Sequence, residues 1–222
     1  MNIKKFFKAL SNPRRAILFF IQSSNLFKNM DDEKYLTLIG KLTFGKQFNI
    51  RNPRTFCEKI NWLKIHNRKP EYTIMVDKYA VKKYVADIIG QNYIIPTLGI
   101  WEHFDDINFD SLPQQFVLKT THGGGSGGVV ICKDKASFNI KSAKKKLEKS
   151  LQSDIYQSSR EWPYKNVPKR IIAERYLEPD NSQFNADLPD YKFFCFDGKP
   201  KFCQVIRERQ SKETIDFYDM DW

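Results

Sequence analysis

A lysine followed by a glycine-rich loop is the part of this sequence with the clearest potential for chemistry. An apolar run at residues 116–118 ends in Lys119. Five glycines then occur within six positions, namely Gly123, Gly124, Gly125, Gly127 and Gly128. Glycines allow backbone N–H groups to approach an anion closely, because no Cβ stands in the way. A lysine beside such a loop adds a positive charge, so the pattern predicts a cradle for phosphate groups.

The context of the loop distinguishes between several kinds of phosphate-binding loop. Its glycines match Gly-x-Gly-x-x-Gly, but that fingerprint opens a helix, whereas residues 129–131 are Val-Val-Ile and predict a strand. The loop also lacks the Gly-Lys-Ser/Thr ending of a Walker A motif. A strand–loop–strand order is typical of a flap over the phosphates of ATP. The alternative is a hairpin tip that binds nothing, for which so many glycines are unusual.

Composition is that of a globular protein with an anionic partner. The 222 residues can form one large domain or two small lobes. The net charge of +11, from 37 basic and 26 acidic residues, favours a nucleotide, a nucleic acid, an anionic polymer or an anionic membrane as partner. The four cysteines contain no Cys-x-x-Cys pair, which argues against a zinc site and fits a reducing cytosol. We therefore expect a cytoplasmic protein.

Residues 1–30 form a separate basic segment. Apolar side chains there are interleaved with Lys4, Lys5, Lys8, Arg14, Arg15 and Lys28, and no acid is present. A basic amphipathic stretch such as residues 1–28 can lie on an anionic bilayer, which would place the protein peripherally on the inner face of the membrane. The alternatives are a terminal helix docked on the body and a loose tail. Pro13 would break any helix through the whole segment.

Residues 31–112 are expected to be mainly helical. The expected elements are a helix over 31–39 that Gly40 ends, a helix over 60–65 behind a Thr55/Glu58 capping box, a helix over 78–89 behind the cap Asp77, and a short strand at 93–95. These elements precede the glycine loop in the chain.

Residues 113–222 change to a pattern dominated by strands. The expected elements are a strand pair at 116–119 and 129–132, a lysine-rich helix at 142–151, a strand at 170–177, a polar loop at 178–190, and a hairpin of 191–196 with 201–206. Asp197-Gly198 between the last two strands is a strong hairpin signal. The mixture predicts an α+β fold.

Five pieces of the sequence, taken in order, resemble the ATP-grasp superfamily, and more narrowly its TupA-like branch, which is named for teichuronopeptide biosynthesis. They are Phe44-Gly-Lys through Trp62-Leu-Lys, Asp77-Lys78-Tyr, the loop from Lys119 to Gly128, Ile171-Ile-Ala-Glu174 and Asp190-Tyr-Lys-Phe. The resemblance runs from near Tyr35 to the last residue. It implies a two-lobed ATP-grasp-like fold behind an N-terminal helical region, with residues 113–168 as the small lobe and 169–222 as part of the large lobe.

The resemblance assigns a role to each matching residue. It implies that Lys119 contacts ATP and that Gly123 to Gly128 close on the phosphates, with Ser126 and His122 as further donors. It implies that Glu174 and the backbone of Tyr176 and Leu177 face adenine. It also implies that Asp190 serves the ribose, that Lys192 serves the phosphates, and that Arg207 steadies an acyl-phosphate intermediate. Each residue also has a structural alternative. Lys119 can be a solvated strand end, Glu174 an outward strand residue, Asp190 a turn residue, His122 a solvated loop residue, and Lys192 and Arg207 guards of a sheet edge.

The resemblance implies ATP and Mg²⁺ as cofactors, with carboxylates and an asparagine on strands after the arginine as metal ligands. The acids that follow Arg207 lack an acid-x-Asn arrangement; they are Glu213, Asp216, Asp219 and Asp221. We therefore expect the terminal metal-binding strands to be missing from this sequence, and the metal ligands stay unassigned.

Three functions are compatible with these observations. The first is an ATP-dependent carboxylate–amine ligase with an acyl-phosphate mechanism, acting on a precursor of a cell-surface polysaccharide or teichuronopeptide. The second is a glycosyltransferase or polysaccharide-assembly protein, although Asp219-Met-Asp221 is a weak metal motif at the very end of the sequence. The third is a non-catalytic anion-binding module. Nucleic acid is not expected as partner, because the lysines at 144–146 lack interleaved aromatic residues for base stacking.

Overall fold

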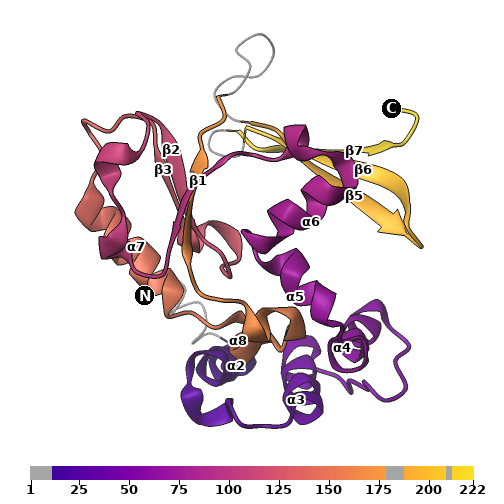
Figure 1. The fold of residues 1–222 in the computed structure, drawn as a ribbon. Helices are drawn as coiled ribbons and strands as arrows, with labels where there is room; N and C mark the ends of the chain where they lie inside the picture. The colour runs from indigo at the N-terminus through magenta and orange to yellow at the C-terminus, as the bar shows by residue number, and fades with distance from the viewer. Residues whose placement is uncertain (1–11, 179–187, 209–211) are drawn as a thin grey trace. The chain divides into compact units, whose positions relative to one another are not determined.

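A computed structural model of the chain describes residues 12–178, 188–208 and 212–222. The chain divides into two compact units, Met1–Arg175 and Tyr176–Trp222, and each is described here by itself. Helices and sheets occur together in the structure (Figure 1). The α+β fold class is therefore confirmed.

The first part of unit 1 is helical, and three of its described helices begin at residues whose side chains cap them. The helices are α2 (Pro13–Ser23), α3 (Asp32–Phe44), α4 (Phe56–His66), α5 (Pro70–Val76) and α6 (Ala80–Ile89). Asn12 caps α2 and Asp31 caps α3 through backbone N–H groups of the first turn. The capping box that Thr55 and Glu58 were expected to form is present at α4. Pro13 stands at the first position of α2, where its missing N–H costs nothing, so this helix starts at the proline and does not run through it.

Two expected elements of this region are wrong. Helix α3 does not end at Gly40 but continues to Phe44, and Gly45 ends it with a left-handed φ of 67°. Gly40 instead lies against the ring of Phe48, where a Cβ would collide with that ring. The residues expected to form a strand at 93–95 lie at a 3-10 turn, Gln91–Tyr93, and the strand starts only at Thr97.

The second part of unit 1 forms a sheet and carries the glycine loop. Four of the described strands, β1 (Thr97–Trp101), β2 (Phe116–Thr120), β3 (Val129–Cys132) and β4 (Ile171–Arg175), pair antiparallel in the order β1-β4-β2-β3. Helix α7 (Ile140–Leu151) packs against the sheet through Ala143 and Leu147, which join the same core as Leu118. Strands 116–119 and 129–132 are therefore confirmed as a pair.

Strand alternation places Lys119 and Glu174 on the sheet face opposite α7. Leu118 pairs with Ala173 and both belong to the core that contains Leu147. Lys119 and Glu174 each stand one residue along from this pair, and successive side chains point to opposite faces. The two charged side chains therefore share one face of the sheet.

The helical part has its own small core and a buried arginine. Ile21 of α2 is buried in a cluster with Tyr35 and Leu36 of α3. Arg160, which follows α8 (Ile155–Ser159), is only 1% exposed; its guanidinium donates to carbonyl oxygens of Phe27, Lys28 and Met30. The same group pairs with Asp32 at 3.3 Å and lies 4.2 Å from the centre of the Tyr35 ring. This arginine joins residues more than 120 positions apart in the chain.

Unit 2 is a sheet of three described strands, β5 (Asp190–Phe196), β6 (Lys199–Arg207) and β7 (Thr214–Asp219), in that order. The hairpin through Asp197 and Gly198 is confirmed; their φ angles are 49° and 72°. Both values are positive, as a two-residue turn of this kind requires. Strand β7 lies where the sequence analysis expects no strand. Most of the predicted polar loop 178–190 lies outside the described residues.

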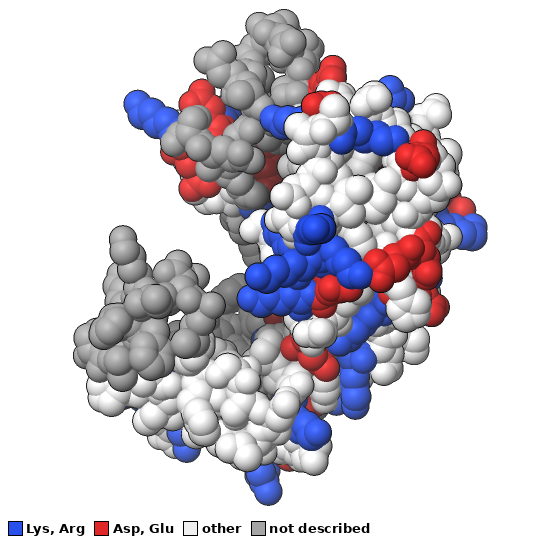
Figure 2. Space-filling view, turned by 90° about the vertical axis from the view of Figure 1, so that its left-hand side faces the viewer, with Lys and Arg blue, Asp and Glu red and all other residues white. Residues whose placement is uncertain are grey.

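Charged side chains of both signs occur on the molecular surface. On the side where α7 lies, lysine and arginine side chains gather in a cluster with acidic side chains beside it (Figure 2). Helix α7 itself exposes Lys145 and Lys146, whereas Lys144 pairs with Asp105 at 2.6 Å. Among the described residues, no helix has both the length and the apolar composition to cross a bilayer. Of the basic segment 1–28 that was expected to contact a membrane, residues 1–11 lie outside the described residues and residues 12–28 are described.

Candidate functional site

The glycine loop connects β2 directly to β3. A 3-10 turn at Gly125–Gly128 is followed at once by the strand that starts at Val129. Because the loop opens a strand and not a helix, it has the geometry of a flap rather than of a dinucleotide-binding turn. Gly125 takes a φ of 61°, which only glycine adopts without strain.

The two ends of the loop are fixed and its apex is exposed. A hydrogen bond of 2.8 Å joins Thr120 Oγ1 to Ser150 Oγ at the end of α7, and a Cβ at Gly123 or Gly128 would collide with Thr120 Oγ1. By contrast, a Cβ on Gly127 would meet no atom within 4 Å among the described residues. The loop therefore has room at its apex for a ligand to approach the backbone.

His122 stands at the start of the loop and is buried, with 3% of its surface exposed. Its Nε2 lies 3.1 Å from the Ser150 carbonyl oxygen, and its Nδ1 has no hydrogen-bond partner within the described part of the chain. Burial lowers the pKa of His122, and the charge of Lys169 acts in the same direction. His122 is thus a neutral buried ring that ties the loop to α7, and not a solvated loop residue. Its predicted role as a phosphate donor stays a prediction.

Lys119 and Glu174 form an ion pair beside the loop. Lys119 Nζ lies 2.5 Å from Glu174 Oε2, and Lys82 Nζ of α6 lies 2.8 Å from Glu174 Oε1. Burial on its own would raise the pKa of Glu174, but hydrogen bonds and charge from Lys119 and Lys82 outweigh it and lower that pKa. Glu174 is therefore an ionised, buried carboxylate and not an outward strand residue. Lys119 is likewise held by a partner and is not a freely solvated strand end.

Lys78 is a candidate residue that the sequence analysis does not assign. It lies between α5 and α6, and its Nζ donates a hydrogen bond to the Gly123 carbonyl oxygen. Burial lowers the pKa of Lys78, and the nearby charge of Lys119 lowers it further. Asp77-Lys78-Tyr is one of the pieces on which the family resemblance rests. The sequence therefore marks Lys78, but the resemblance assigns no role to it.

The resulting constellation is suited to hold an anion. Lys78 contacts the glycine loop at Gly123, the charge of Lys119 on β2 acts on Lys78 from nearby, and each ammonium carries three donors. One donor of each has a partner in the protein, on Gly123 and Glu174 respectively, which leaves others for a ligand. Lys82 differs from them, because its Nζ also donates to the Ile95 carbonyl oxygen at 2.6 Å and is fixed between two protein acceptors.

The remaining predicted residues belong to unit 2. Tyr176 and Leu177 directly follow β4, and Leu177 is 42% exposed. Asp190 and Lys192 stand at the start of β5 and pair with each other at 3.4 Å. Arg207 ends β6 and donates to Asp216 at 2.8 Å and to the hydroxyl of Tyr218. That these residues meet Lys119 and Glu174 around one nucleotide stays a prediction.

The described residues contain no cluster of three or more potential metal ligands. Among them, no three His, Cys, Asp or Glu side chains lie close enough to hold a metal ion. Mg²⁺ bound to nucleotide phosphates commonly takes only one or two protein carboxylates. The described geometry therefore assigns no Mg²⁺ ligand, and no chemical step below depends on one.

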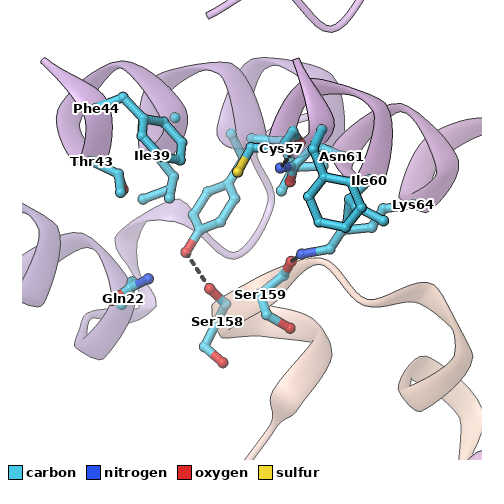
Figure 3. Close-up of a pocket in the computed structure, with 14 residues that line it drawn as sticks. Gln22, Ile39, Thr43, Phe44, Cys57, Ile60, Asn61, Lys64, Ser158 and Ser159 are labelled. Carbon is cyan, nitrogen blue, oxygen red and sulfur yellow. Dashed lines mark hydrogen bonds between the residues drawn. The ribbon is translucent and has the colours of Figure 1, made fainter. Parts of the chain in front are cut away.

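A cavity of about 290 Å³ lies elsewhere in unit 1, between α3, α4 and residues 158–159. Its wall is mainly apolar, and Lys64 is the charged side chain among its lining residues; Lys64 Nζ donates to the Ser159 carbonyl oxygen at 2.9 Å (Figure 3). None of the predicted site residues lines this cavity. This cavity is therefore not the candidate site, which is defined by Lys78, Lys119 and Glu174 beside the glycine loop.

Comparison with known families agrees with the geometry of the loop and the lysines. The model of the TupA-like ATPgrasp family matches residues 58–222, which is most of the chain. No curated protein and no solved structure matches the chain. The chain belongs to the TupA-like ATP-grasp family, as the resemblance in its sequence indicated. Membership implies nucleotide binding and a ligase-like activity of the ATP-grasp type.

Replacing single glycines should separate the loop's ligand-binding part from its structural part. Gly127→Ala is expected to leave stability nearly unchanged, because open space surrounds this position. ATP affinity should nevertheless fall about tenfold, since the new methyl group keeps phosphate from the backbone. Gly128→Ala should instead lower the free energy of unfolding by about 1–3 kcal/mol, because its Cβ would collide with Thr120 and Ser150.

Thermal unfolding and isothermal titration with ATP measure the two effects for both variants. Unchanged ATP affinity in Gly127→Ala would show that the apex of the loop does not contact the phosphates.

Proposed function

We propose that the chain is an ATP-dependent carboxylate–amine ligase. The observation that carries the proposal is the convergence of Lys78 and Lys119 on the glycine loop, together with the buried carboxylate of Glu174. Cations and backbone N–H groups around a loop of this type stabilise the charge on a transferring phosphoryl group. A carboxylate offers several acceptor positions, so Glu174 can accept from the adenine amino group while it keeps its lysine partners.

The proposed reaction has two steps. A carboxylate oxygen of the first substrate attacks the γ-phosphorus of ATP, and the bond to ADP breaks, which gives an acyl phosphate and ADP. The amine of the second substrate then attacks the acyl carbon and displaces inorganic phosphate, which leaves an amide. In this proposal Lys78 and Lys119 neutralise phosphate charge in the first step, and Arg207 steadies the acyl phosphate.

We further propose a precursor of a cell-surface polysaccharide or teichuronopeptide as the substrate, handled at the inner face of the membrane. The described part of the basic segment supports a peripheral contact. Helix α2 buries Ile21 against the body but exposes Ile17 and Phe20 by 47% and 53% next to Arg14 and Arg15. An exposed apolar strip beside basic residues is suited to an anionic lipid surface. The alternative of a non-catalytic anion-binding module gains no support from the surface around α7, because charges of both signs are mixed there.

Trapping of the acyl phosphate tests the proposal. The protein is incubated with Mg-ATP, hydroxylamine and a panel of carboxylates that includes acidic amino acids and uronic acids. We expect one class of carboxylate to give a hydroxamate together with ADP and phosphate, and Lys119→Ala to abolish all three products. Transfer of a sugar from a nucleotide-sugar donor, with no ADP formed from ATP, would instead establish the glycosyltransferase alternative.

A further inference from the structure

Hydrogen bonds join three distant segments of unit 1 around Lys78. The segments are the turn at residues 77–79 between α5 and α6, Thr121 at the end of β2, and residues 168–170 before β4. Two of them lead directly into the candidate site, because Lys78 lies in the first and the glycine loop begins just after the second. The way these segments are joined therefore decides where the Lys78 ammonium stands relative to the loop.

Thr121 is fully buried and binds both of the other segments. Its carbonyl oxygen accepts from the Lys78 backbone N–H at 3.1 Å, and its own N–H donates to the Arg170 carbonyl oxygen at 2.9 Å. Its hydroxyl accepts from the Arg170 N–H at 3.1 Å and donates to the Pro168 carbonyl oxygen at 2.7 Å. The backbone at Lys78 and the backbone at residues 168–170 are thus both fixed to one residue, Thr121, just before the glycine loop.

An ion pair between Asp77 and Arg170 joins the turn at residues 77–79 directly to residues 168–170. Arg170 Nη2 lies 2.8 Å from Asp77 Oδ2, and Asp77 Oδ1 accepts from the Tyr79 N–H at 2.9 Å. The guanidinium also lies over the Tyr79 ring, 5.0 Å from its centre. Asp77 is only 2% exposed, so the carboxylate side of this ion pair is shielded from water.

We infer that Asp77 and Arg170 are positioning residues for phosphate binding, which act through Lys78 without contacting the nucleotide themselves. This inference rests on the proposed function. Asp77 fixes the turn on both sides of Lys78, since its carboxylate holds the Tyr79 N–H and the Arg170 guanidinium together. Without the ion pair, the Lys78 side chain loses the support that aims its ammonium at the Gly123 carbonyl and at any phosphate beside it.

The inference predicts a loss of affinity that depends on the phosphates of the ligand. Asp77→Asn is compared with wild type in titrations with ATP and with adenosine, which lacks the phosphates. We expect ATP binding to weaken about tenfold, as when a charge-assisted hydrogen bond is lost, and adenosine binding to stay the same. In the background of Lys78→Ala, Asp77→Asn should have no further effect on ATP affinity, because the residue that it positions is already gone.

Two further variants keep the test decisive. Arg170→Lys retains the charge but not the planar guanidinium that pairs with Asp77 and lies over the Tyr79 ring, and it should give the same phosphate-dependent loss even if Asp77→Asn folds poorly. Asp87→Asn removes an exposed ion pair with Lys83 from the same helix α6 and should change neither affinity.

Equal losses for ATP and adenosine, or additive effects of Asp77→Asn and Lys78→Ala, would show a merely structural role and overturn the inference. Failure of the wild-type protein to bind ATP would overturn the proposed function itself.

Discussion

Replacement of Glu174 by alanine is expected to lower the free energy of unfolding by about 3 kcal/mol. The carboxylate is 6% exposed and bridges Lys82 and Lys119, whose side chains are 15% and 26% exposed. Its removal leaves two largely buried ammonium groups without their acidic partner, and an unpaired buried charge is costly. Chemical denaturation of wild type and variant measures the difference. Asp87→Ala is the matched control, because its pair with Lys83 is exposed and should contribute less than about 1 kcal/mol.

The contribution of Glu174 should also depend on pH in a defined direction. Its pKa in the folded protein is lowered, so the unfolded chain binds its proton more tightly. The stabilisation is therefore fully present above the unfolded value near 4.3 and is lost as pH falls through the lower folded pKa. The stability difference between wild type and Glu174→Gln should shrink below about pH 4. A difference that stays constant from pH 7 to pH 3 would contradict an ionised Glu174.

Arg160→Ala is expected to destabilise the helical region of unit 1 by about 3–5 kcal/mol. The guanidinium is fully buried, donates to backbone carbonyl groups that include those of Phe27, Lys28 and Met30, and pairs with Asp32, so its loss removes a buried charged donor from all of these acceptors. Arg51→Ala is the control, since Arg51 is exposed and also pairs with one acid, Glu33. Thermal and chemical unfolding of both variants give the comparison. Equal stability of Arg160→Ala and Arg51→Ala would show that the buried arginine is not a structural anchor.

The strands around the loop could be predicted from sequence because their signals are local. Residues 116–119 are an apolar run that ends in a charge, and Asp197-Gly198 supplies the positive φ angles that a tight hairpin needs. The capping box at Thr55 and Glu58 is local in the same sense, because both partners lie within one turn. In each case neighbouring residues alone determine the backbone conformation.

Features that depend on distant contacts could not be predicted in this way. Gly40 stays helical because its missing side chain admits the ring of Phe48, which no helix-ending rule contains. The burial of His122 depends on the Ser150 carbonyl group at the end of another helix. The place of Lys78 in the candidate site could not be predicted for the same reason. Its acceptor, Gly123, is 45 residues away, so only the fold reveals that this lysine and the glycine loop belong together.

The central claim is that the glycine loop and its lysines bind Mg-ATP. The most direct measurement is a calorimetric titration of wild type, Lys119→Ala and Lys83→Ala with Mg-ATP, supported by thermal shift. Lys83 is an exposed lysine paired with Asp87 and serves as the control for loss of positive charge.

Wild type and Lys83→Ala are expected to bind Mg-ATP with equal affinity and to gain stability from it. Lys119→Ala should bind at least about tenfold more weakly, because it lacks a charged donor to phosphate. Equal binding by Lys119→Ala and wild type, or no binding by either, would contradict the account.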